Sequence, residues 1–169
     1  MDLVLTILLF VHVLGAIIAF GPPFAFALMG PMAAAEPMHM NFTLRMQKKI
    51  ASTLVTPLAL VQGVTGLLLV WRISSVAGVS FLDVLTRGWL LVAIVLYVIA
   101  LTISFALIYP NLRILLDGTS GPPPAPPAGG APAGPPPHIM AAAKRIRMAS
   151  MTNLVLVVSI VFLMVTKPF

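Results

Sequence analysis

The sequence predicts an all-α integral membrane protein, a four-helix bundle forming a single membrane domain over residues 1–169. Of its residues, 60% are hydrophobic and only 8% are charged, whereas soluble domains carry roughly a quarter of charged residues. The charged residues lie between long apolar runs, because a charge at the bilayer centre costs at least ~2.5 kcal/mol. Continuous apolar runs predict helices, which satisfy their own backbone hydrogen bonds in lipid.

Four runs are long enough to cross roughly 30 Å of hydrocarbon at about 1.5 Å per residue. Aromatic residues that favour the membrane interface stand at the ends of these runs. They are Trp71, Trp89 and Tyr109. The predicted helices lie at about residues 3–32, 51–70, 89–109 and 148–166.

The first run is too long for one straight span, and Gly21-Pro22-Pro23 lies inside it. Proline lacks an N–H and its ring clashes with the preceding turn. We therefore expect this helix to be kinked or broken there, with residues 24–32 ending a kinked helix or lying along the interface. A cleaved signal peptide is not expected, because Asp2 precedes the run and no Lys or Arg does.

The basic residues divide unevenly between the connections. Seven Lys and Arg lie in residues 33–50 and 110–147, and three lie in the other connections. The positive-inside rule then places both termini outside and the two basic loops in the cytoplasm. The net charge of +6 has this topological explanation, so we expect no nucleic-acid partner.

A proline-rich loop at 118–137 separates the last two predicted helices. Its composition predicts a polyproline II or coil linker. Two roles are open: a tolerated connection, or a ligand for an aromatic-lined groove on a partner.

Four polar residues reach a similar depth near the middle of the membrane. They are His12, Gln62, Tyr97 and Ser159. One interpretation is that His12 only fixes helix packing through a hydrogen bond. The other is an axial ligand or proton carrier, because imidazole binds metals and titrates near neutral pH. In the second case, Gln62 or Tyr97 would hold the other ring nitrogen.

A segment rich in methionine and histidine lies at 29–46. Thioether and imidazole together favour Cu(I), which makes Met38, His39 and Met40 candidate copper ligands. The alternative is that methionine simply adapts to irregular packing at the membrane boundary.

Classical catalysis is not expected. The sequence has no cysteine and no acidic residue inside the predicted spans. It also lacks an HExxH motif and a glycine-rich phosphate loop. No catalytic residue is assigned, and the chain is expected not to be an enzyme.

Several short motifs resemble known membrane families. The motifs are His12 before FGPPF (20–24), TP at 56–57 with GLLL at 66–69, GWL at 88–90 and the final KPF at 167–169. With these the chain resembles the HemJ-type protoporphyrinogen oxidases and is similar in plan to the CopD-type copper-resistance membrane proteins. In overall character it most resembles the bacterial integral-membrane family of unknown function numbered 2269.

The HemJ-type resemblance implies four helices, a haem b bound by histidine, and oxidation of a porphyrinogen. Only His12 carries over, because the histidine and lysine that follow GWL in that family are replaced here at 91–93. The bacterial resemblance places the chain in a cytoplasmic membrane. Three functions stay open: a structural or accessory subunit beside other membrane subunits or a second copy, a haem-binding redox protein using His12, and copper or small-solute handling through 29–46.

Overall fold

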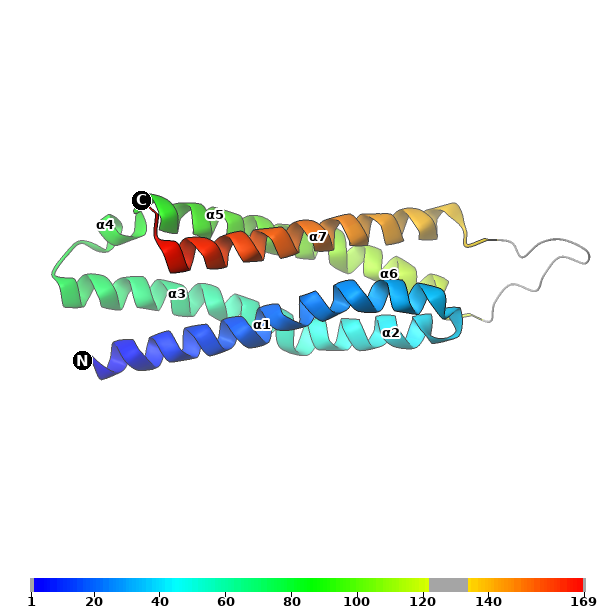
Figure 1. Ribbon diagram of the computed structural model, residues 1–169, viewed down its shortest axis with the longest axis horizontal. Helices are drawn as coiled ribbons and strands as arrows, with labels where there is room; N and C mark the ends of the chain where they lie inside the picture. Colours follow the sequence, from blue (N-terminus) through cyan, green and yellow to red (C-terminus); the bar gives the residue numbers. More distant parts are fainter. Residues whose placement is uncertain (1, 122–133, 169) are drawn as a thin grey trace, which may run out of the picture.

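The computed structural model describes residues 2–121 and 134–168, and within them the fold is helical with no strand. Four continuous helical rods lie side by side in an elongated bundle (Figure 1), and all four are long and apolar enough to cross a membrane. The all-α prediction is confirmed. The elements are α1 (Leu3–Ala35), α2 (Pro37–Ile50), η1 (Ala51–Val55), α3 (Thr56–Ala77), α4 (Phe81–Leu85), α5 (Gly88–Ile103), η2 (Ser104–Ile108), α6 (Tyr109–Gly118) and α7 (Pro137–Thr166).

The first rod, α1, stays helical through all three of its prolines, Pro22, Pro23 and Pro31. It bends partway along its length (Figure 1). Of the two expectations for Gly21-Pro22-Pro23, the kink holds and the break is wrong. Residues 24–32 are accordingly the end of a kinked helix and not a separate interfacial segment. Prolines are tolerated in membrane helices where neighbouring groups and local adjustments satisfy the freed carbonyls.

The helices are longer than the membrane is thick. On α7, Arg147 and Lys167 are about 20 residues apart, or roughly 30 Å of helix. On the second rod, Lys49 and Arg72 bracket a stretch of roughly 35 Å. Since a bilayer core is about 30 Å thick, everything beyond Lys49 and Arg147 extends outside it on one side.

We call this part the extension: residues 24–50, 110–118 and 137–147. The sequence predicted basic loops at 33–50 and 110–147. This prediction was wrong in that α2, α6 and the first turns of α7 are helical. The proline-rich loop (118–137) lies largely outside the described residues, which omit 122–133.

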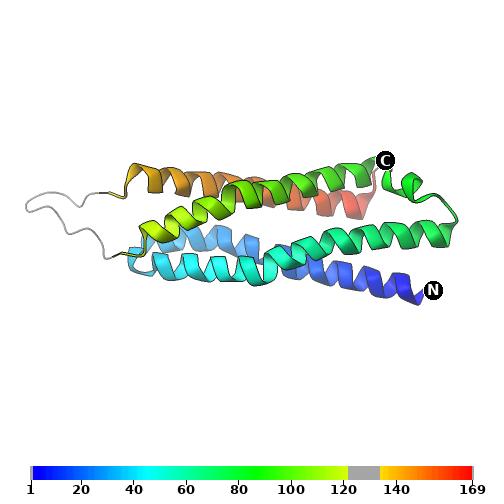
Figure 2. The ribbon, with the colours of Figure 1, turned by 180° about the vertical axis from the view of Figure 1, so that it is seen from behind.

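The extension has a hydrophobic core of its own. Leucines of α2 and α6 pack there against the start of α7, and Figure 2 shows α2 and α6 at the same end of the bundle. The buried members are Leu44, Leu112, Leu115, Leu116, Ile139 and Ala142. Met40 and Ile146 pack against this cluster. The extension is therefore a packed helical body and not a set of connections.

Two rods contain a π-helical segment that ends two residues before a proline. Segment η1 precedes Pro57, and segment η2 precedes Pro110. A π-segment widens the helix, which relieves the clash between a proline ring and the carbonyl four residues earlier. The residues before the two prolines, Thr56 and Tyr109, hydrogen-bond to each other through their hydroxyl groups. The two irregular segments therefore meet at one level of the bundle.

At the opposite end, Asp2 begins α1 and joins it to α3. Its carboxylate accepts hydrogen bonds from the backbone N–H groups of Val4 and Leu5 at 3.0 and 3.3 Å. It also lies 2.6 Å from the Arg72 guanidinium. Partial desolvation raises the pKa of Asp2, but these N–H groups and Arg72 together lower it below its ordinary value of 3.8.

We expect Asp2→Asn to lower the Tm of the protein in detergent, and Asp2→Ala to lower it further. Asparagine still caps the helix, whereas alanine removes both the cap and the ion pair. Because the pKa of Asp2 is lower in the folded protein than in the unfolded chain, its charged form stabilises the fold at pH values above 3.8. This stabilisation is lost as the pH falls through the folded-state pKa. The gap in Tm between wild type and Asp2→Asn should therefore shrink on acidification below about pH 3.8.

Asp83→Asn is the matched control, because Asp83 is exposed and forms no ion pair within the described part of the chain. Equal Tm values for wild type and Asp2→Ala at neutral pH would contradict the assignment.

Candidate functional site

The polar residues predicted at mid-membrane depth meet only in part, where α1 packs against α3. His12 Nδ1 lies 2.8 Å from Thr65 Oγ1. Gln62 Nε2 donates to the backbone carbonyl of His12 at 2.7 Å. Gln62 and Thr65 are buried and His12 is half-buried. His12 and Gln62, which share a predicted depth, are thus in contact, and Gln62 bonds to the backbone of His12 and not to its ring.

Two glycines let α1 and α3 approach each other at this cluster. A Cβ on Gly15 would lie 3.4 Å from the Gln62 amide, and one on Gly66 would lie 3.4 Å from His12 Cε1. On the next interface, a Cβ on Gly63 would lie 2.8 Å from the Tyr97 hydroxyl. Small residues are typical where membrane helices pack closely.

Tyr97 and Ser159 do not join the cluster. The Tyr97 hydroxyl donates to the carbonyl of Ala59 at 2.8 Å. The Ser159 hydroxyl donates to the carbonyl of Val155 in its own helix at 2.9 Å. Equal depth in the membrane does not fix the direction in which a side chain points.

Thr65 is the residue that sequence reasoning missed. It occupies the position beside the His12 ring that was expected for Gln62 or Tyr97. The signal was its place three residues after Gln62, which puts both side chains on one face of the helix.

The Thr65 hydroxyl can hydrogen-bond to Nδ1 in either neutral tautomer of His12. If Nδ1 carries the proton, Thr65 accepts it and can donate to the Val61 carbonyl, which lies 3.0 Å away. The Nε2 lone pair is then left for a ligand. If Nε2 carries the proton, Thr65 donates to Nδ1. Thr65 can therefore pair with either neutral tautomer, and the contact resembles the arrangement in which a neighbour orients a metal-binding histidine.

The candidate copper ligands diverge. They are consecutive residues of α2, so their side chains point about 100° apart around the helix. Met38 is 88% exposed, while Met40 packs against the extension core. His39 Nε2 instead lies 3.9 Å from a carboxylate oxygen of Glu36. This geometry does not gather the three side chains around one point.

Together the four rods and the internal polar cluster define a multi-pass α-helical membrane protein. Residues 6–168 match the family described as predicted integral membrane protein (DUF2269), and the chain belongs to that family. No curated protein and no solved structure matches it. The predicted membership in family 2269 is confirmed, and the relation to the HemJ and CopD types stays a prediction.

A double-mutant cycle on His12→Leu and Thr65→Val should measure the contact between these two side chains. We expect a coupling energy of about 0.6 kcal/mol, and no more than about 1.7, as for other hydrogen bonds between membrane helices. His12→Gln should be milder than His12→Leu, because the amide can still bond to Thr65. The measurement is the free energy of unfolding in mixed micelles.

Ser159→Ala serves as the control, because its hydroxyl bonds only within its own helix. A coupling near zero between His12 and Thr65 would refute the contact.

Proposed function

We propose that the protein is a structural or accessory subunit of a membrane assembly. The observation that supports this is the apolar outer surface of the extension, which lies beyond the reach of the lipid core. Its side chains lie on α1 and α2, which pack beside each other. They are Phe24, Leu28, Met32, Met38, Phe42 and Met46, and their exposed fractions run from 45% to 88%. We call this set the outer face.

Its residues recur every four positions on each helix, so each helix presents one continuous apolar stripe. Lipid covers apolar side chains inside the bilayer, but not side chains that project past it. A large exposed apolar surface outside the membrane marks a protein contact. Methionine suits such a contact, because its flexible thioether adapts to different partners. A second copy of the chain and another membrane subunit are the two kinds of occupant.

The double substitution Leu28→Arg/Phe42→Arg should release the protein from its assembly without unfolding the bundle. Both side chains are exposed, so arginine costs little in the free chain but buries an unpaired charge in a contact. Blue-native electrophoresis of mildly solubilised membranes should show a band of lower mass.

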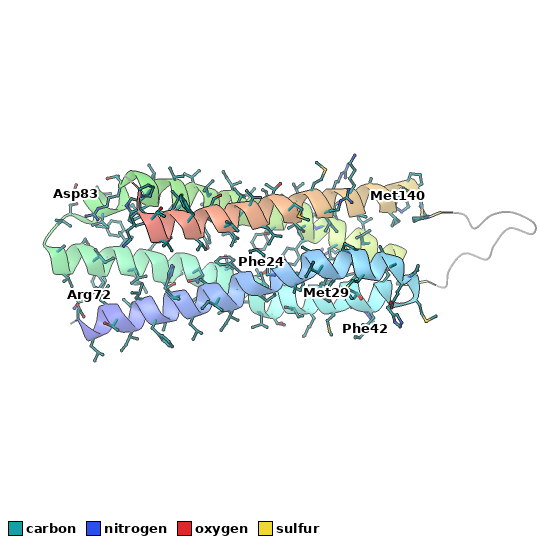
Figure 3. The ribbon with its side chains drawn as sticks, viewed as in Figure 1. Phe24, Met29, Phe42, Arg72, Asp83 and Met140 are labelled. Atoms are coloured by element: carbon teal, nitrogen blue, oxygen red, sulfur yellow. The ribbon has the colours of Figure 1, made fainter. Side chains whose placement is uncertain are left out.

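Met140→Arg is the matched control, because Met140 is also exposed on the extension but lies at its opposite edge from Phe42 (Figure 3). An unchanged native mass for the double variant would contradict the proposal.

For the orientation, we propose a bacterial cytoplasmic membrane with both termini outside. The support is that the extension end of the bundle carries seven of the ten Lys and Arg residues. At the other end, Arg72 pairs with Asp2, and the Lys167 ammonium lies 5.8 Å from the centre of the Trp89 ring.

A reporter fused after Phe169 should therefore read as periplasmic, and one inserted near Gly129 should read as cytoplasmic. The reason is that Lys and Arg near membrane helices are retained on the cytoplasmic side. Enzymatic reporters active in only one compartment make the measurement, and the reverse pattern would refute the orientation.

A haem-binding redox function is the second candidate. The observation that favours it is the contact of Thr65 with Nδ1, which leaves Nε2 as the ligand nitrogen. His12 would hold the iron, and Thr65 would accept the Nδ1 proton and orient the ring. Haem, when bound, supplies one-electron redox chemistry. No second histidine stands in the membrane spans, so His12 would be the single imidazole ligand.

Under this second candidate, protein purified from haem-supplemented cells should show a Soret band that His12→Ala abolishes. Thr65→Val should shift or weaken the band without removing it, because it releases the ring but keeps the ligand. Ser159→Ala should leave the spectrum unchanged. Absorbance spectroscopy decides the matter, and a colourless wild-type protein would refute haem binding.

A further inference from the structure

A hollow of about 510 Å³ opens between α2 and α6 on the outside of the extension. One stripe of α2, continuing into η1, supplies most of its wall, at positions 41, 45, 48, 49 and 52. The opposite wall comes from the end of α6 and the turn after it. The polar residues that line it are Asn41, Arg45, Lys48, Lys49, Ser52, Asp117 and Ser120.

The three basic side chains of the hollow form no ion pair within the part of the chain that the structure describes. Within residues 2–121 and 134–168, no carboxylate lies within 4.0 Å of Arg45, Lys48 or Lys49. Asp117 is the one acidic residue in the lining, so the described hollow carries a net charge of +2. Asn41 donates to Thr119 Oγ1 at 3.0 Å, which fastens α2 to the chain after α6 and holds the two walls together.

The position of the hollow indicates what this charge meets. Lys48 and Lys49 are the last charged residues before the apolar span of η1 and α3. They therefore stand at the level of the lipid headgroups, and Leu54, one turn deeper, is exposed toward the acyl chains. Basic pockets between helices at this level suit phosphate headgroups, and arginine can bind a phosphate with two parallel hydrogen bonds.

We propose that this hollow binds the phosphate of an anionic phospholipid headgroup. The guanidinium of Arg45 and the two lysine ammonium groups contact the phosphate oxygens, and the acyl chains run along the exposed face of η1 and α3. The proposal is independent of the accessory-subunit function and of the haem candidate, because it uses none of the same residues.

The test titrates the full-length protein in dodecyl maltoside with dioleoyl phosphatidylglycerol and follows the rise in Tm. The variant Arg45→Gln/Lys48→Gln/Lys49→Gln should move the midpoint to at least about tenfold more lipid. The matched control is Lys144→Gln/Arg145→Gln/Arg147→Gln, which removes the same charge from the same end of the bundle on α7. It should move the midpoint by less than about threefold.

Three results would overturn the proposal. An equal shift in both triple variants would show unspecific attraction to charge. Equal stabilisation by dioleoyl phosphatidylcholine would show that the anionic headgroup is not recognised. Displacement of bound phosphatidylglycerol by millimolar inorganic phosphate, with the same rise in Tm, would identify a soluble anion as the ligand.

Asp117→Asn tests the hollow without removing any cation. It deletes a like charge from the lining, so phosphatidylglycerol should bind about two- to fivefold more tightly. This variant also decides the question if the triple substitution fails to fold. Unchanged or weaker binding by Asp117→Asn would overturn the proposal.

Discussion

The mismatch between helix length and bilayer thickness governs the whole architecture. The four membrane-crossing rods run for 30 to 41 residues within the described chain, and about 20 residues suffice to cross the hydrocarbon. The excess lies on one side, because charged residues pin the other end of the bundle near Arg72, Arg87 and Lys167. The protein is therefore a membrane bundle with a helical extension, and the two parts face different solvents.

The helices change geometry where they leave the lipid. In α1 the adjacent prolines Pro22 and Pro23 lie there, and in the next two rods the π-segments η1 and η2 do. Each proline frees or displaces a carbonyl, so each needs a local adjustment. The bond between Thr56 and Tyr109 ties two of these adjustments together. The extension is thus joined to the membrane bundle at a level where two helices are irregular and hydrogen-bonded to each other.

Charge and hydropathy were enough to predict the fold class and the four spans, because lipid penalises a buried charge strongly. The extension was not predictable in the same way. Residues 37–50 carry many polar side chains, which suit a loop as well as a helix, and their core partners at Leu112 and Ile139 are distant in sequence. Within the site, depth could be counted along each helix, so Gln62 was found near His12. The direction of a side chain around its helix could not be counted, so Thr65 was missed and Tyr97 was misplaced.

Polar contacts attach α1 to the bundle in addition to its close packing against α3. Only Ala19 and Ala33 of its 33 residues are buried, and between membrane helices apolar burial supplies no driving force, because lipid is equally apolar. The polar contacts are the pairing of Asp2 with Arg72 and the contacts of His12 with Gln62 and Thr65, all directed at α3. The face of α1 that is turned away from α2, α3 and α7 stays free. Along the span, lipid covers this face. In the extension the acyl chains do not reach it, and under the proposed accessory-subunit function the apolar stripe through Leu28 contacts another protein.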